Sequence, residues 1–286
     1  MTRSAPAAIL YRDAHLVAVD KPPGVLVHRT RIDAHAEQVL LQQVRDAIGH
    51  RVWPVHRLDK GTSGVLALAL ESAAARKLAD AFAAGAVTKR YLALVRGWPA
   101  LTGRIEHALA PRDDDAEDMD DDERRAAALP AVTEFVRLAT LELPVRVDRY
   151  PATRYALLDV RPRTGRRHQI RRHLKHVAHP ILGDATFGKG LHNRFLARHT
   201  GATRLWLHAR SLTLPHPASG CRLTIEALPG REWATPLAWV GWRADAPADA
   251  EADRALAMLA ALPGLGTPWR AHDPDHGPGD DEVWRD

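Results

Sequence analysis

One carboxylate in the sequence stands among basic side chains, an arrangement that could serve catalysis. Asp59 lies in VHRLDKGTSG, residues 55–64, between Arg57 and Lys60. The apolar run at 65–70 follows at once and is typical of a buried strand. A loop held by a buried strand is a usual location for a catalytic acid, so Asp59 is a candidate for acid–base or nucleophilic chemistry. The alternative interpretation is a structural ion pair with a neighbouring base.

The densest basic segment spans residues 161–175 and contains no acid. A run of this kind can neutralise several phosphates, so it can bind RNA or DNA in a salt-dependent way. Residues spaced by four along it share one face of a helix, which favours an outward basic face. A simple solvated helix face is the alternative interpretation. The bases are Arg161, Arg163, Arg166, Arg167, Arg171, Arg172 and Lys175.

Other chemistries fit the residues less well. Four histidines lie in or beside the basic segment, but their spacing does not match a zinc motif, and no carboxylate follows until Asp184. The chain has one cysteine, Cys221, which excludes a disulfide framework and a Cys-rich zinc module. A protein-kinase catalytic loop requires His-Arg-Asp with a following Asn and a Gly-rich phosphate loop, and the sequence has neither. We therefore expect no metal. The histidines are His168, His173, His176 and His179.

The distribution of charge sharpens the expectation of a polyanionic partner. The formal net charge is +5, but residues 113–123 carry −9 and residues 245–286 carry −7. Without those two stretches, the remaining 233 residues carry +21. A strongly basic body favours nucleic acid as a partner, although a soluble enzyme of high isoelectric point has the same charge balance.

The elements that must hold these residues follow from the hydrophobic pattern. The strands are more numerous than the helices and are mostly joined as hairpins, which predicts an α+β fold with a mixed, mostly antiparallel sheet flanked by helices. Helices are expected at 37–48, 72–84, 166–177 and 232–241. Strands are expected at 9–11, 15–19, 25–27, 65–70, 89–96, 131–142, 154–161, 204–214 and 222–227.

The same pattern predicts the organisation of the chain of 286 residues. We expect one catalytic domain over 1–244, interrupted by an acidic loop at 111–130. Residues 245–286 are expected to form an acidic, disordered tail, although 251–262 could be helical. No membrane span or signal sequence is apparent, so the expected location is the cytoplasm.

Five segments of the sequence, beginning with the loop that carries Asp59, are similar to the motifs of one protein family. The segment HRLDKGTSG resembles the catalytic signature of the RluA family of pseudouridine synthases. KPPGVLVH at 21–28, KRYLALVRG at 89–97 and TGRRHQIRRHL…HPILGD at 164–184 resemble that family's other motifs, in the family's order. The closing WLHARSLTLPHP…LTI at 206–225 is also similar. The sequence is more similar still to the branch that modifies uridine 65 of tRNA, and the resemblance covers roughly residues 8–243.

The resemblance implies an isomerase that converts a uridine in RNA to pseudouridine. The N1–C1′ bond of the nucleotide breaks, the uracil turns, and C5 bonds to C1′, so no cofactor is needed. Asp59 would be the essential carboxylate, acting on C1′, on uracil C6 or on the 2′ proton. Each route needs an ionised Asp59 in a largely dry pocket, and a nearby cation must offset the cost of burial. By its place in HQIR, Arg171 would be that cation.

The resemblance also assigns roles to other residues. Tyr91 would stack on the uracil and could help to remove the C5 proton, whereas a core aromatic in a strand is the alternative. Since the nucleotide must be flipped out of its stack, Arg57 would fill the vacated space. Arg166 and Arg167 would hold phosphates, with Arg172 and Lys175 as further RNA contacts.

Three interpretations of function follow from these features. The first is a pseudouridine synthase that acts on tRNA as a monomer, without membrane or nucleotide cofactor. The second is the same activity on ribosomal RNA. The third is an RNA-binding protein without catalysis, which would have no need of an acid set among bases.

Overall fold

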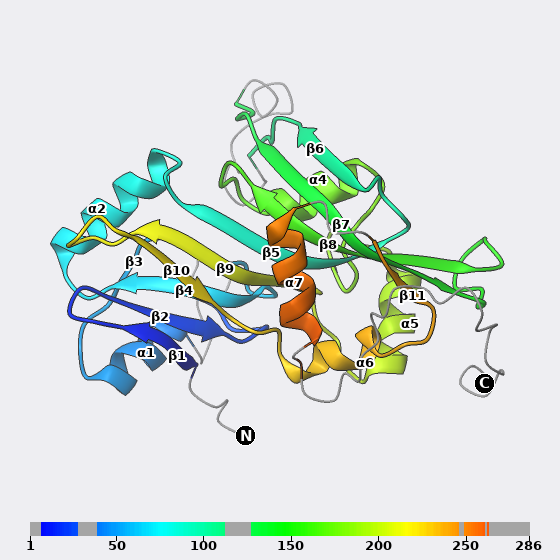
Figure 1. Ribbon diagram of the computed structural model, residues 1–286, viewed down its shortest axis with the longest axis horizontal. Helices are drawn as coiled ribbons and strands as arrows, with labels where there is room; N and C mark the ends of the chain where they lie inside the picture. The colour runs from blue at the N-terminus through cyan, green and yellow to red at the C-terminus, as the bar shows by residue number, and fades with distance from the viewer. Residues whose placement is uncertain (1–6, 28–38, 112–126, 246–248, 261, 263–286) are drawn as a thin grey trace.

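The structure is a computed structural model that describes residues 7–27, 39–111, 127–245, 249–260 and 262. One sheet with 11 strands forms its framework (Figure 1). The main path, in spatial order, is β1 (Ala8–Arg12), β2 (Leu16–Lys21), β4 (Ser63–Ala69), β9 (Leu207–Pro215), β5 (Thr88–Arg96), β8 (Thr153–Pro162), β7 (Val132–Leu143) and β11 (Trp242–Ala244). Beside this path, β10 (Arg222–Glu226) pairs with β9, β3 (Trp53–Pro54) with β4, and β6 (Thr102–Glu106) with β7.

The fold class predicted from the sequence is confirmed. Every pairing between the named strands is antiparallel except that of β4 with β9, which is parallel. The helices are α1 (Leu40–Ile48), α2 (Ser72–Ala83), α4 (Gln169–His176), α5 (Gly190–Thr200), a short 3₁₀ turn at Arg231–Trp233, α6 (Ala234–Leu237) and α7 (Ala250–Ala260). None of the helices in the described part of the chain has the length and apolar composition that crossing a membrane requires.

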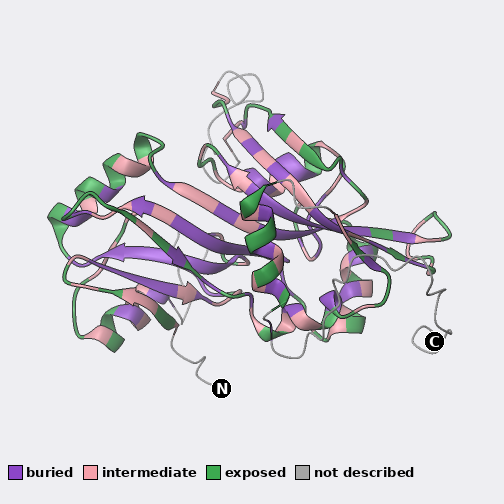
Figure 2. Ribbon diagram, viewed as in Figure 1, coloured by how far each residue is buried: buried purple, intermediate pink, exposed green. Residues whose placement is uncertain are grey.

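The two faces of the sheet carry different layers. Along β5, Leu92 and Leu94 pack with α7, whereas Ala93 and Val95 pack with Ile170 and other residues near α4. This alternation is the period of two that a pleated strand imposes on its side chains. Figure 2 shows that the central strands are mostly buried, while the outer side of α7 is exposed. Helix α4 and the residues before it therefore lie on the opposite face of the sheet from α7.

The prediction of a disordered tail over 245–286 is wrong for residues 250–260, where the helix considered as an alternative at 251–262 is present. Residues 250–260 form α7, which crosses the sheet in Figure 1 and buries Ala252, Ala255 and Leu259 in the core. The small residues let the helix lie close to the strands, and the acidic side chains outside this stripe dominated the composition. Residues 263–286, like the acidic stretch 113–123, lie outside the described residues.

Other sequence expectations differ from the structure in detail. The strand expected at 25–27 is only an isolated bridge between Leu26 and Val39, because the two prolines before it interrupt regular pairing. Helix α5 and the strands β3, β6 and β11 were not expected. Helix α5 lacks a clear apolar stripe, since among its residues only His192 and Leu196 are buried.

A buried polar chain links β4 to β9 directly behind the loop that carries Asp59. His208 Nε2 must donate to the carbonyl of Ala227, which leaves Nδ1 to accept the hydroxyl of Ser63 at 2.9 Å. Arg204 in turn donates to the Ser63 hydroxyl at 2.7 Å. Burial, together with the nearby Arg204 charge, lowers the pKa of His208 to about 4. The imidazole is therefore neutral at pH 7, and its hydrogen bond with Ser63 joins the start of β4 to β9.

This burial predicts how stability depends on pH. The unfolded state takes up a proton on His208 at higher pH than the folded state, so stability is complete above pH 6.5 and is lost as the pH falls toward 4. His208→Gln keeps an acceptor and a donor but cannot titrate. Between pH 7 and 4.5, urea unfolding should show that the variant loses about 2 kcal/mol less than the wild type. Equal losses in the two proteins would contradict a buried neutral His208.

Candidate active site

A pocket of about 670 Å³ opens on the face of the sheet that carries α4. Its walls are the loop before β4, the C-terminal end of α2, the start of β5 and the segment that leads into α4. It therefore gathers segments that lie far apart in the sequence. Its polar and aromatic lining includes Arg57, Asp59, Lys89, Tyr91, Arg163, Arg166, Arg167, His168 and Arg171.

A buried lysine, Lys21, stabilises the loop that carries Asp59 through hydrogen bonds. Lys21 is fully buried and donates hydrogen bonds to the carbonyls of Pro22, Val25 and Lys60 at 2.8–3.1 Å. The amide of Gly24 donates to the same Lys60 carbonyl. Burial lowers the pKa of Lys21 to about 7, and the negative charge of Asp59 opposes that shift. Lys21 thus connects the segment KPPGVLVH to the loop that carries Asp59.

Arg171 joins two carboxylates. Its guanidinium donates to Asp184 through Nε and Nη2, at 2.7 and 2.9 Å, and to Asp59 through Nη1, at 3.1 Å. The side chain of Asp184 is fully buried, whereas that of Asp59 is 18% exposed toward the pocket. Burial alone would raise the pKa of Asp184, but Arg171 and two backbone amides hold it below its usual range. Asp184 therefore orients Arg171, and Arg171 orients Asp59.

His168 lies on the other side of Asp59. Its Nε2 is 3.8 Å from Asp59 Oδ1, and its side chain is 17% exposed. The residue has φ 52°, in the left-handed region, and it precedes the first residue of α4. Such a conformation is strained for a non-glycine residue and is kept where the surroundings impose it. Here it starts the helix so that His168 and Arg171 both reach Asp59.

Tyr91 lies on β5, and its ring contributes to the wall of the pocket. Its strand partners at this position are Val160 on β8 and Ala209 on β9. Burial and the negative charge of Asp59 both raise the pKa of the Tyr91 hydroxyl. The phenol therefore stays protonated at neutral pH and can serve as a proton donor or acceptor through its neutral form.

The predicted RNA-binding residues separate into two groups. Arg57, Arg166 and Arg167 line the pocket. Arg172 and Lys175 do not: Arg172 donates to the carbonyl of Ala110 at 2.9 Å, and Lys175 lies 5.9 Å from the centre of the Phe187 ring, which Arg171 also contacts. Within the described ranges, no three His, Cys, Asp or Glu side chains are grouped as a metal site would require.

Sequence reasoning assigned no role to two residues that shape this site. Asp184 stood at the end of the motif HPILGD but was considered only as a distant metal ligand. Its position directly after Gly183, the residue type that a left-handed turn favours, could have indicated a constrained turn. In the structure Gly183 has φ 74°, and a Cβ there would collide with the Arg204 carbonyl. Lys21 gave no signal beyond its motif, because a lysine is not expected to be fully buried.

Comparison with known proteins agrees with the geometry. A family described as RNA pseudouridylate synthase matches residues 15–176. A tRNA pseudouridine synthase C from Salmonella typhimurium is 46% identical over 235 residues, which cover 82% of this chain and 90% of that protein. One of the same name from Pectobacterium carotovorum is 45% identical, and the matched region covers 84% of this chain but only 63% of that longer protein. The solved structure titled Human RNA Pseudouridylate Synthase Domain Containing 1 superposes with a TM-score of 0.65 and 25% identity, covering 90% of this chain and 97% of that one.

Proposed function

We infer that this chain, which belongs to the family of RNA pseudouridylate synthases, isomerises a uridine of tRNA to pseudouridine. The observation that carries the proposal is the pocket in which Asp59 is held by Arg171 opposite Tyr91. An RNA-binding protein without catalysis would not need a carboxylate oriented by a buried ion pair at the bottom of a pocket. The chemistry needs a carboxylate, a counter-charge and a proton-transfer group, and these three side chains supply them.

Each residue has a separate part in this proposal. Asp59 is the carboxylate that acts on the nucleotide, and Arg171 keeps it ionised and aimed into the pocket. Tyr91 lies where the uracil ring would stack, and its neutral hydroxyl can take part in the transfer of the C5 proton. Arg57 at the rim is placed to occupy the space that the flipped nucleotide leaves.

The preference for tRNA over ribosomal RNA rests on the names of the similar relatives, and position 65 rests on the motif resemblance alone. The test uses the purified full chain and transcripts of tRNA and ribosomal RNA that carry tritium at uracil C5. Isomerisation at C5 releases that tritium to water. Release from tRNA but not from ribosomal RNA is the expected result, and the reverse would assign the second substrate. Release from neither would overturn the assignment of activity.

We further propose that the bases at the rim of the pocket bind phosphates of the tRNA. Arg166 is exposed and lines the pocket, and its side chain donates from Nε to the carbonyl of Pro130 at 3.2 Å. Arg166→Ala should weaken tRNA binding and reduce the slope of log K against log salt by about 1. Arg198→Ala, on the exposed side of α5 and away from the pocket lining, is the matched control. Equal slopes for the Arg166 variant and the wild type would exclude this phosphate contact.

The remaining expectations also belong to this proposal. We propose that the protein acts as a monomer, in the cytoplasm and without a cofactor. We also propose a single catalytic domain, with the earlier boundary at residue 244 moved beyond α7, because that helix packs into the core.

A further inference from the structure

Three charged side chains are buried together on the face of the sheet opposite the pocket. The carboxylate of Asp159, on β8, accepts one hydrogen bond from Nε of Arg90 on β5 and one from Nε of Arg210 on β9, both at 2.9 Å. The side chain of Asp159 is 1% exposed, that of Arg90 is 9% exposed, and that of Arg210 is fully buried. Three adjacent central strands each contribute one charge, so the group ties those strands to each other.

These three residues leave one positive charge without compensation, and α7 supplies the missing anion. Glu251 Oε2 lies 3.2 Å from Nη2 of Arg210 and 3.4 Å from Nη1 of Arg90. The Glu251 carbonyl accepts a further bond from Arg210 Nη2 at 3.2 Å. The first turn of α7 is fixed at this place, because Asp249 Oδ1 accepts the amides of Glu251 and Ala252. A charge buried without a partner is costly, so Glu251 has a defined electrostatic task.

The strand pairing connects this ion cluster to Tyr91. In the pairing of β5 with β9, Arg90 lies opposite Ser211 and Tyr91 lies opposite Ala209. Arg210 is therefore the extra residue of a β-bulge at the step from Arg90 to Tyr91. Bulges of this kind change the direction of neighbouring side chains and are frequent beside active sites. The buried guanidinium of Arg210 fills the bulge on one face, and Tyr91 projects into the pocket on the other.

We propose that Glu251 of α7 is a positioning residue for Tyr91. It neutralises Arg90 and Arg210, which hold the bulge that sets the Tyr91 ring in the pocket. The inference rests on the proposed role of Tyr91. It makes the helix after residue 249 part of the catalytic machinery, although Glu251 itself faces away from the substrate. Arg254 also lies near Glu251, but its guanidinium is 3.8 Å from the carboxylate and its side chain is 58% exposed. It therefore competes only weakly with Arg90 and Arg210 for the Glu251 charge.

The test combines a neutral variant with a matched control on the same helix. Glu251→Gln removes the charge with little change of shape, and Asp253→Asn makes the same change of charge at an exposed position in the same turn. Full-length proteins are labelled with fluorotyrosine, which gives one fluorine resonance for each of four tyrosines. The Tyr91 resonance is assigned as the one lost in Tyr91→Phe. It should shift or broaden in Glu251→Gln and remain unchanged in Asp253→Asn.

Steady-state kinetics on the tRNA transcript provide the second readout. Glu251→Gln should lower kcat about tenfold with KM within about twofold, because a misplaced group weakens the chemical step more than binding. In a Tyr91→Phe background, the same change should lower kcat little further. An equal loss in both backgrounds, or an unmoved Tyr91 resonance, would overturn the proposal. If the wild type releases no tritium but the resonance still shifts, the proposed function fails while the positioning role stands.

Discussion

Asp59→Asn should abolish pseudouridine formation while leaving the protein folded and able to bind tRNA. The amide has nearly the same shape, but it cannot ionise, attack a carbon or accept a proton. We expect kcat to fall by about 10⁴-fold or more, at or beyond the upper range for a single acid–base group. Arg171 keeps both of its bonds to Asp184 when Asp59 is replaced, so no buried charge loses its partner and the midpoint of thermal unfolding should change little. Tritium release from tRNA measures the first effect and differential scanning calorimetry the second.

The matched control is Asp46→Asn, an exposed carboxylate on α1 that pairs with the adjacent Arg45 and lies outside the pocket lining. It should retain wild-type turnover. A residual activity of Asp59→Asn above about one per cent of the wild type would assign the essential carboxylate elsewhere, because general acid–base groups contribute at least about 10²-fold. A loss of activity together with a loss of folding would instead make Asp59 a structural residue.

Arg171→Ala should impair both stability and activity, because the guanidinium serves two carboxylates. Removing it leaves Asp184 fully buried and without its cation, which should cost about 3–5 kcal/mol of unfolding free energy. It also frees Asp59, so activity should fall at least about 10³-fold. Arg171→Lys keeps a positive charge but cannot make all three bonds. That variant should fold and remain strongly impaired, which separates the chemical effect from the structural one.

The pH dependence of the Arg171→Ala variant provides a sharper test. In the wild type, Arg171 keeps the pKa of Asp184 low, so that pair adds stability above the carboxyl's ordinary pKa. Without the cation, burial raises the pKa of Asp184, and stability is lost as the pH rises through that value. The deficit of the variant, measured by urea unfolding, should therefore be smaller at pH 5 than at pH 8. A deficit that does not change with pH would show that Asp184 is not the carboxylate left unpaired.

The patterns in the sequence indicated the sheet and the candidate catalytic residues for different reasons. Alternation and breakers predicted most of the strands, because a half-buried strand imposes a period of two that survives in the sequence. Periodicity alone could not bring Asp59, Tyr91 and Arg171 together, since they lie on three segments joined only by the topology. Their grouping depended on the motif resemblance, and the structure places all three around one pocket.

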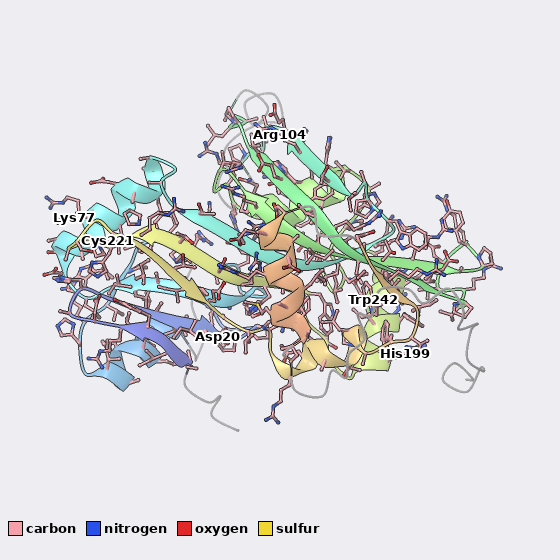
Figure 3. The ribbon with its side chains drawn as sticks, in the orientation of Figure 1. Asp20, Lys77, Arg104, His199, Cys221 and Trp242 are labelled. Carbon is pink, nitrogen blue, oxygen red and sulfur yellow. The ribbon has the colours of Figure 1, made fainter. Side chains whose placement is uncertain are left out.

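The sequence could not predict most of the contacts between charged residues that lie far apart in the chain. The partner of Arg171 is Asp184, thirteen residues further along the chain, and spacing gave no reason to pair them. The helix at 250–260 was expected only as an alternative to a disordered tail, because its buried side is mostly alanine within an acidic, alanine-rich composition. Glu251 appeared there as one of many surface acids. Only the arrangement of β5, β8 and β9 shows that its charge completes a buried cluster. The same holds for Asp20, which is labelled in Figure 3: burial and the negative charge of Glu232, from a distant segment, raise its pKa to about 6.

The most direct test of the account is a map of pseudouridine in cellular RNA. A strain that lacks the gene is complemented with the wild type or with Asp59→Asn, and tRNA and ribosomal RNA are probed base by base. We expect one tRNA uridine, at position 65, to be modified with the wild type and unmodified with the variant, while every ribosomal site is unchanged. If the two strains had the same pseudouridines in their tRNA, the proposal that Asp59 is essential for this isomerisation would be wrong.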